Sequence, residues 1–343
     1  MKKVLLCLAL SIAVIIAAIS TANAKTVMKM AIGDPENSEM GVVGKSFKKY
    51  VEEQTNGELE VQLFFASALG SETETIHNVR RGTLDFTIAG IANYVPFVKK
   101  LGVLTLPYLF DGLTDVVEAT NGSAHELLNG YAVKEGGFRI LTWTYTDFRY
   151  ISNSKGPITK LADIKGMKFR VPQSAVLLAS YKAWGANPVP ISWSETFTAL
   201  QQGVVDGQCY GYIGFNAMKF AEANQKFITE VHYTYQLQPL SVSERVFRKL
   251  SPEYQQIIID GGKVAQKAVL DYQINESGKA KQLLIDEGVT ISSLSDEDQW
   301  RTLAISKVWP EMADFVGGQD AINEFLAACN KPAWNPGQQS AKR

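Results

Sequence analysis

The segment that follows Ser251-Pro252 most constrains how this chain can fold. Serine is a favoured N-cap residue and proline fits the first helical position, so the pair predicts a helix start. Helical periodicity continues to about Glu287, giving roughly 36 residues, or about 54 Å at ~1.5 Å per residue. A helix of this length exceeds the diameter of one domain, so we expect it to brace two. Gly261-Gly262 weakens the prediction, because a glycine costs about 1 kcal/mol inside a helix.

Strand and helix patterns alternate along the rest of the chain, which favours an α/β fold. Two segments, Ser71–Glu74 and Ser192–Glu195, have the pattern of a capping box. Residues 228–240 are predicted to form one strand. No Pro- or Ser-rich linker separates the two expected domains, so we expect the chain to cross between them more than once.

The first 24 residues have the pattern of a secretory signal. Lys2 and Lys3 precede an apolar run from Val4 to Ile19, and Ala22-Asn23-Ala24 offers small residues at a cleavage site. The alternative is a membrane anchor. An apolar run of about 16 residues spans about 24 Å, however, short of the roughly 30 Å hydrocarbon core. We therefore expect residues 1–24 to be removed and the mature chain, from Lys25, to reach the bacterial periplasm.

Composition excludes several classes of function. With 20% charged residues and a formal net charge of −1, the chain lacks the basic excess typical of nucleic-acid binding. We find no motif for a catalytic nucleophile, a metal or a phosphate, so we expect neither catalysis nor a cofactor. Cys209 and Cys329 follow the signal segment, and either a disulfide or two separate buried thiols is compatible with export.

One segment, residues 149–212, concentrates residues suited to binding. Arg170 lies in the alternating run Lys168–Val171, on one face of a short predicted strand that Pro172 ends. A guanidinium offers two parallel donors that match a carboxylate. By spacing alone, a surface salt bridge is the favoured interpretation of this arginine.

The chain from about Val27 to Leu326 resembles the solute-binding subunit of TRAP transporters, the DctP family. The most specific matching segments are Lys165–Pro172 and Thr198–Gln208, in the order and spacing of that family. The resemblance implies a fold of the periplasmic binding protein type: two α/β domains that close on a ligand between them, with a long helix across both. It also implies a small organic anion as ligand and the subunits of a sodium-driven TRAP membrane permease as partners.

The resemblance suggests domain limits. We expect domain I to comprise residues 25–147 and about 236–275, domain II about 148–235 and 276–330, and residues 331–343 to form a C-terminal tail.

The resemblance also implies a set of site residues. The carboxylate-binding arginines fall on Arg170 and Arg149, a polar position on Gln173, an aromatic wall on Trp193, and a position commonly held by asparagine on Tyr210. Core packing is the alternative role for Trp193. From the first domain we add Tyr94 and, with less support, Asn93.

The sequence departs from the family pattern at one point. Members often read Gln-Glu-Asn where this chain reads Gln208-Cys209-Tyr210. The replacements at Cys209 and Tyr210, both of which we count among the ligand-binding residues, are less polar, so we expect a monocarboxylate with an apolar or aromatic portion. A C4-dicarboxylate or a sugar acid remains the alternative.

Three functions stay open from the residues alone. The leading one is a monomeric periplasmic receptor that delivers an organic acid to the permease. The others are a binding protein that presents its ligand to a membrane sensor, and a periplasmic enzyme that acts on a carboxylate.

Overall fold

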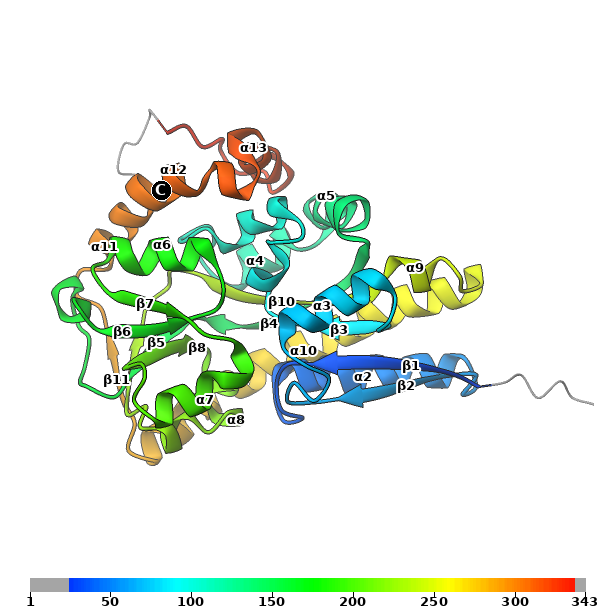
Figure 1. Cartoon of the computed structure of the whole chain (residues 1–343), viewed down its shortest axis with the longest axis horizontal. Coiled ribbons are helices and arrows are strands. Elements are labelled where there is room, and N and C mark those ends of the chain that lie inside the picture. The colour runs from blue at the N-terminus through cyan, green and yellow to red at the C-terminus, as the bar shows by residue number, and fades with distance from the viewer. Residues whose placement is uncertain (1–24, 337–343) are drawn as a thin grey trace, which may run out of the picture.

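The computed structural model describes residues 25–336 and contains two β-sheets (Figure 1). The expected signal segment lies outside the described residues. The first sheet has the order β2-β1-β3-β10-β4, formed by Leu59–Phe64, Thr26–Ile32, Phe86–Ile88, Tyr235–Ser243 and Phe138–Phe148. The second has the order β11-β9-β5-β8-β6-β7, formed by Thr290–Ser293, Phe227–Glu230, Tyr150–Asn153, Gly207–Tyr210, Lys168–Val171 and Asn187–Pro190.

Helices surround both sheets. The α-helices are α2 (Glu39–Gln54), α3 (Glu72–Arg81), α4 (Leu113–Ala119), α5 (Gly122–Tyr131), α6 (Ala175–Ala183), α7 (Trp193–Gln201), α8 (Tyr212–Ala217), α9 (Glu244–Phe247), α10 (Pro252–Asp286), α11 (Glu297–Leu303), α12 (Trp309–Met312) and α13 (Gly318–Ala328). Shorter 3-10 or π-helical turns cover Ile91–Tyr94, Lys99–Thr105, Ala132–Gly136, Leu161–Ile164, Phe220–Ala223, Ala304–Val308 and Asp314–Val316. None of the helices between residues 25 and 336 is both long enough and apolar enough to span a membrane.

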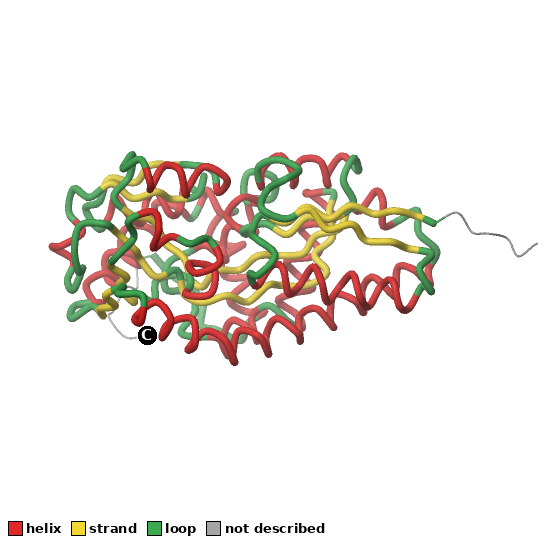
Figure 2. Tube along the Cα trace, turned by 90° about the horizontal axis from the view of Figure 1, so that it is seen from below, coloured by secondary structure: helices red, strands yellow, loops and turns green. Residues whose placement is uncertain are grey.

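The long helix predicted after Ser251 is confirmed. Helix α10 has 35 residues, and the Ser251 side chain accepts a hydrogen bond from the Tyr254 N–H at its start. It contacts α2 and β4 beside the first sheet and α8 beside the second, and Figure 2 shows it running along one side of the molecule. Its mid-helix glycines have a packing reason: a Cβ on Gly262 would lie 2.7 Å from the Leu141 carbonyl oxygen. The helix therefore packs closely against β4 because Gly262 carries no side chain.

Of the two predicted capping boxes, only the first is formed. Ser71 and Glu74 exchange both hydrogen bonds at the start of α3. The second prediction is wrong, because the Ser192 hydroxyl bonds the Glu195 carboxylate and caps no backbone N–H of α7.

Besides α10, which links β10 to β11, two short connections join the sheets. One passes from β4 to β5 through Arg149, and the other from β9 to β10 through residues 231–234. The predicted single strand over residues 228–240 is therefore wrong, because the chain leaves one sheet at Glu230 and enters the other at Tyr235. The Arg149 N–H donates to the Thr234 carbonyl at 2.9 Å, so the two crossing segments are paired. The domain limits expected from the sequence remain a proposal. The division of the strands between two sheets supports them.

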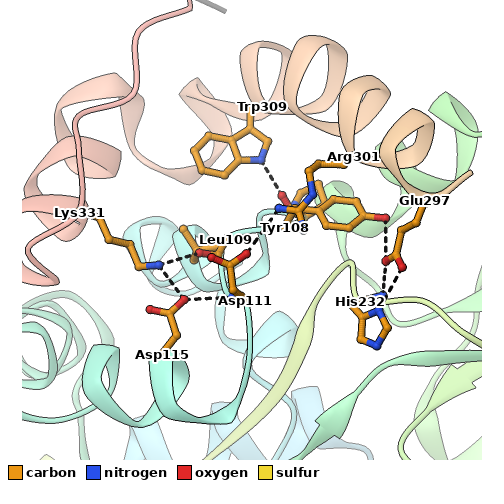
Figure 3. Close-up of polar contacts among 10 residues, drawn as sticks. Tyr108, Leu109, Asp111, Asp115, His232, Glu297, Arg301, Trp309 and Lys331 are labelled. Atoms are coloured by element: carbon orange, nitrogen blue, oxygen red, sulfur yellow. Dashed lines mark hydrogen bonds and ion pairs between the residues drawn. The ribbon is translucent and has the colours of Figure 1, made fainter. Parts of the chain in front are cut away.

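The C-terminal segment, from α11 onward, also contacts elements beside both sheets (Figure 3). The Trp309 indole donates to the Pro107 carbonyl at 2.8 Å, and Lys331 pairs with Asp115 at 2.7 Å. The first residues of the expected tail are packed, since Trp334 is buried.

Glu297 of α11 holds the crossing segment at His232. It accepts from the His232 backbone N–H at 2.6 Å, and its other oxygen lies 3.1 Å from His232 Nδ1. Tyr108 is buried in the hydrophobic cluster that includes Phe169 and Trp184. Its hydroxyl donates to the Glu297 carboxylate at 3.4 Å. The hydrogen bond with Glu297 raises the pKa of His232. Burial favours the neutral form of Glu297, but its hydrogen bonds with His232 lower its pKa overall.

This pair predicts a small pH dependence of stability. The His232 contribution is present below its unfolded pKa of about 6.5 and is lost as pH rises through the raised folded value. We expect His232→Gln to lower the melting temperature more at pH 6 than at pH 9. The effect should be at most about 1 kcal/mol, because the imidazole is half exposed. Thermal melts at the two pH values measure it, and an equal shift at both would contradict it.

Candidate functional site

Three of the predicted site residues lie at the carboxyl ends of strands in the second sheet. Arg170 is in β6, Trp193 begins α7 just after β7, and Tyr210 ends β8. Strands β7 and β8 both pair with β6 in parallel, so their carboxyl ends meet at one edge. This edge is where open α/β sheets bind ligands.

The first sheet presents a matching edge. Asp34 follows β1, Glu72 begins α3 after β2, and Asn93 lies in the 3-10 helix Ile91–Tyr94 after β3. Strands β2 and β3 pair in parallel with β1, which brings the three positions together. Both edges line one cavity of about 40 Å³, with room for about three water molecules at roughly 10–15 Å³ each. The space between the two edges is therefore narrow.

Two arginines give the cavity its positive charge. Arg170 is 2% exposed; its Nε donates to the Ile191 carbonyl at 2.9 Å, and its guanidinium lies 5.3 Å from the Trp193 ring centroid. Its terminal nitrogens make no hydrogen bond that would occupy the fork. Burial, reinforced by repulsion from Arg149, lowers the pKa of Arg170 to about 10. An anion bound here would relieve both effects.

Cys209, which does not line the cavity, contacts the Arg149 guanidinium. Its Nε lies 3.2 Å from the Cys209 sulfur, and its Nη2 donates to the Cys209 carbonyl at 2.9 Å. Among the ion pairs of residues 25–336, none within 4.0 Å includes Arg149 or Arg170. Two buried guanidinium groups without a paired carboxylate are costly unless a ligand supplies the negative charge.

Glu72 faces the arginines from the first domain. One carboxylate oxygen accepts from the Gly90 N–H and the other from the Asn93 amide, each at 2.7 Å. Burial raises the pKa of Glu72, while the Gly90 N–H and the two arginines oppose that shift. These bonds fix the carboxylate in the cavity wall.

Tyr210 bridges the two edges. Its hydroxyl donates to Asp34 Oδ2 at 2.6 Å and accepts from the Gln238 amide at 2.8 Å. Its ring stacks on Trp193 with centroids 4.7 Å apart and planes 18° apart. Burial raises the pKa of Asp34 to about 7, against the smaller effect of the Tyr210 hydrogen bond.

Five of the eight predicted site residues line the cavity: Asn93, Arg149, Arg170, Trp193 and Tyr210. Whether they bind the ligand stays a prediction.

The other three do not line it. Gln173 is exposed, because the turn after Pro172 points it outward. Tyr94 is buried against Phe138, with its hydroxyl bonded to Ser241, so it belongs to the core. Cys209 lies behind Arg149. Cys209 and Cys329 are both free thiols.

Several lining residues were missed from the sequence. Asp34, Glu72, Gln236 and Gln238 all line the cavity. The sequence offered a signal for Glu72, since it follows Ser71 in the first capping box. We interpreted it only as a residue of the helix start and did not predict that it also lines the cavity. Gln236 and Gln238 lie inside a strand, and nothing local distinguishes them from core residues.

The described part of the chain holds no cluster of three or more His, Cys, Asp or Glu side chains arranged to bind a metal.

Two α/β halves joined by crossing strands, with a cavity lined by two arginines between them, define the class of solute-binding proteins for small anions. Over residues 30–314 the sequence matches the family described as "Bacterial extracellular solute-binding protein, family 7", or DctP. The chain belongs to this family, which confirms the resemblance drawn from its motifs.

Relatives and solved structures agree with this assignment. A solute-binding protein of Verminephrobacter eiseniae is 34% identical over 90% of this chain and 91% of its own length. The 2,3-diketo-L-gulonate-binding periplasmic protein YiaO of Escherichia coli is 29% identical over 79% and 81%.

Two crystal structures of TRAP periplasmic solute-binding proteins superpose closely. One from Polaromonas, with bound D-erythronate, has a TM-score of 0.83 and 28% identity, covering 90% of this chain and 100% of that one. One from Shewanella oneidensis, with bound succinate, has a TM-score of 0.83 and 26% identity, covering 89% and 100%.

Proposed function

We propose that this protein is a monomeric periplasmic receptor that binds a small organic acid by domain closure and delivers it to a sodium-driven TRAP permease. The observation that carries the proposal is the pair Arg149 and Arg170, buried in one cavity without an ion-pair partner. The Arg170 fork suits a carboxylate, and Arg149 adds a second positive charge. Family membership supports the transport role, and the binding of organic acids by relatives supports the ligand class.

Two features bear on the finer identity of the ligand. The sequence favoured a monocarboxylate with an apolar or aromatic portion, because Tyr210 replaces a smaller polar residue. In the folded chain, however, the Tyr210 hydroxyl is engaged by Asp34 and Gln238, so this end of the cavity is polar. We therefore favour the alternative of a hydroxylated carboxylate, similar in kind to a sugar acid.

Titration calorimetry tests the anion requirement. We expect D-erythronate to bind at least about 100-fold more tightly than erythritol, its uncharged polyol counterpart, because erythritol cannot use the arginines. Equal binding of the two compounds would contradict the proposal. Phenylacetate and succinate complete the panel, and tightest binding of phenylacetate would restore the apolar ligand expected from the sequence.

A further inference from the structure

Three buried side-chain oxygens in the cavity wall have no hydrogen-bond partner. They are Asp34 Oδ1, Gln236 Oε1 and Gln238 Oε1, and all three residues line the cavity. Asp34 is 1% exposed, Gln236 4% and Gln238 1%, so solvent outside the cleft does not reach them. Each is an acceptor, and a buried acceptor without a donor is unfavourable.

Two of the nearby donors are already used, while the Trp193 indole N–H has no hydrogen-bond partner of its own and favours the ionised form of Asp34. The Tyr210 hydroxyl has one proton, which it gives to Asp34 Oδ2, and the Gln238 amide donates to Tyr210. These bonds orient the Asp34 carboxylate and leave Oδ1 with free acceptor capacity. The chain thus holds these acceptors in place without satisfying them.

The arrangement gives the cavity two chemically different regions. Arg149 and Arg170 present donors, while Asp34, Gln236 and Gln238 present unused acceptors. The stacked rings of Trp193 and Tyr210 link the regions, since the arginines lie over these rings and the Tyr210 hydroxyl reaches Asp34. A ligand that suits both regions carries a carboxylate at one end and hydrogen-bond donors along the rest of its carbon chain.

We propose that Asp34 is a specificity-determining residue that accepts a hydrogen bond from a ligand hydroxyl and, with Gln236 and Gln238, selects polyhydroxylated carboxylates over their deoxygenated counterparts. This inference rests on the proposed function of the cavity as an organic-acid site.

The charges around Asp34 are consistent with that role. Glu72 of α3 and Glu39 of α2 repel its negative charge, the donors of Tyr210 and Trp193 favour its ionised form, and Arg149 attracts it. Burial without enough donors raises the pKa of Asp34 to about 7. A hydroxyl donated to Oδ1 stabilises the ionised carboxylate and completes its hydrogen bonds.

The experiment compares D-erythronate with butyrate, which has the same number of carbons and a carboxylate but no hydroxyls. Calorimetry measures both dissociation constants for the wild-type protein, Asp34→Ala, Asp34→Asn and the control Gln173→Ala, whose side chain lies outside the cavity. We expect the wild type to prefer D-erythronate strongly and Asp34→Ala to reduce that preference by about 10- to 100-fold, with butyrate affinity little changed. Asp34→Asn should lie between them, since it keeps one oxygen and the shape of the side chain. Gln173→Ala should match the wild type.

The outcomes separate the two proposals. If neither acid binds the wild type, the organic-acid function fails. If both bind wild type and Asp34→Ala with the same preference, the function stands and the role of Asp34 is overturned. If Asp34→Ala weakens the binding of butyrate as much as that of D-erythronate, Asp34 supports closure of the cleft on any carboxylate and does not select hydroxylated ones. The inference is then likewise overturned. Melting temperatures of the variants show that they are folded.

Discussion

Replacing Arg170 with alanine is expected to weaken binding of the organic acid by about thirty- to a thousand-fold, or about 2–4 kcal/mol. The guanidinium lies in the cavity with its terminal nitrogens free, and no carboxylate of residues 25–336 forms an ion pair with it. Arg170→Lys keeps the charge but loses the planar fork and the bond to Ile191, so it should lose a large part of the same affinity. Calorimetry with D-erythronate measures both variants.

The control for Arg170 is the stability of the ligand-free protein. The Arg170 side chain donates one hydrogen bond within residues 25–336, from Nε to Ile191, which contributes about 1 kcal/mol, and loss of its repulsion with Arg149 acts in the other direction. We therefore expect the apo melting temperature of Arg170→Ala to change by no more than about 2–4 °C. Unchanged affinity with a large fall in apo stability would assign Arg170 to the scaffold and remove the main support for an anion site.

The second large effect is on folding. Gly262→Val should destabilise the protein by about 2–3 kcal/mol, because its Cβ would meet the Leu141 carbonyl oxygen at 2.7 Å. That oxygen belongs to the backbone of β4, which cannot move without disturbing the first sheet. Thermal denaturation should show a fall in melting temperature of about 5–10 °C.

A glycine elsewhere in the same helix serves as the matched control. A Cβ on Gly278 would meet nothing within 4 Å. Gly278→Ala should therefore raise stability by up to about 1 kcal/mol, from helix propensity alone. If the Gly262 and Gly278 variants shifted stability in the same direction, close packing of α10 on β4 would not be the reason for Gly262.

Much of the local structure could be predicted from the sequence because its causes are local. The N-cap at Ser251 and the capping box at Ser71 involve residues three positions apart, so their geometry is contained in the pattern itself. The capping box at Ser192 did not form, because the Glu195 N–H donates to the Ser192 carbonyl at 3.3 Å rather than to its hydroxyl.

The candidate site was predicted only in part. Arg170, Trp193 and Tyr210 lie at or just after recognisable strand ends in a segment that matches a known family, so their approach to one cavity could be anticipated. Gln173 and Tyr94 were misplaced, because one turn or one face of a short helix decides whether a side chain points to the cleft, the core or the solvent.

The sequence by itself determined the alternation of strands and helices, the long helix that braces both halves, and the family to which the chain belongs. These depend on periodicity, capping and motif spacing, which are written along the chain. Only the tertiary structure decided that Asp34 meets Tyr210 across 176 positions, and that Gln236 and Gln238 face the cavity rather than the core. It also decided that Gly262 is a packing residue rather than a weakness in the helix. Such contacts arise where the two sheets and α10 come together, so no local pattern encodes them.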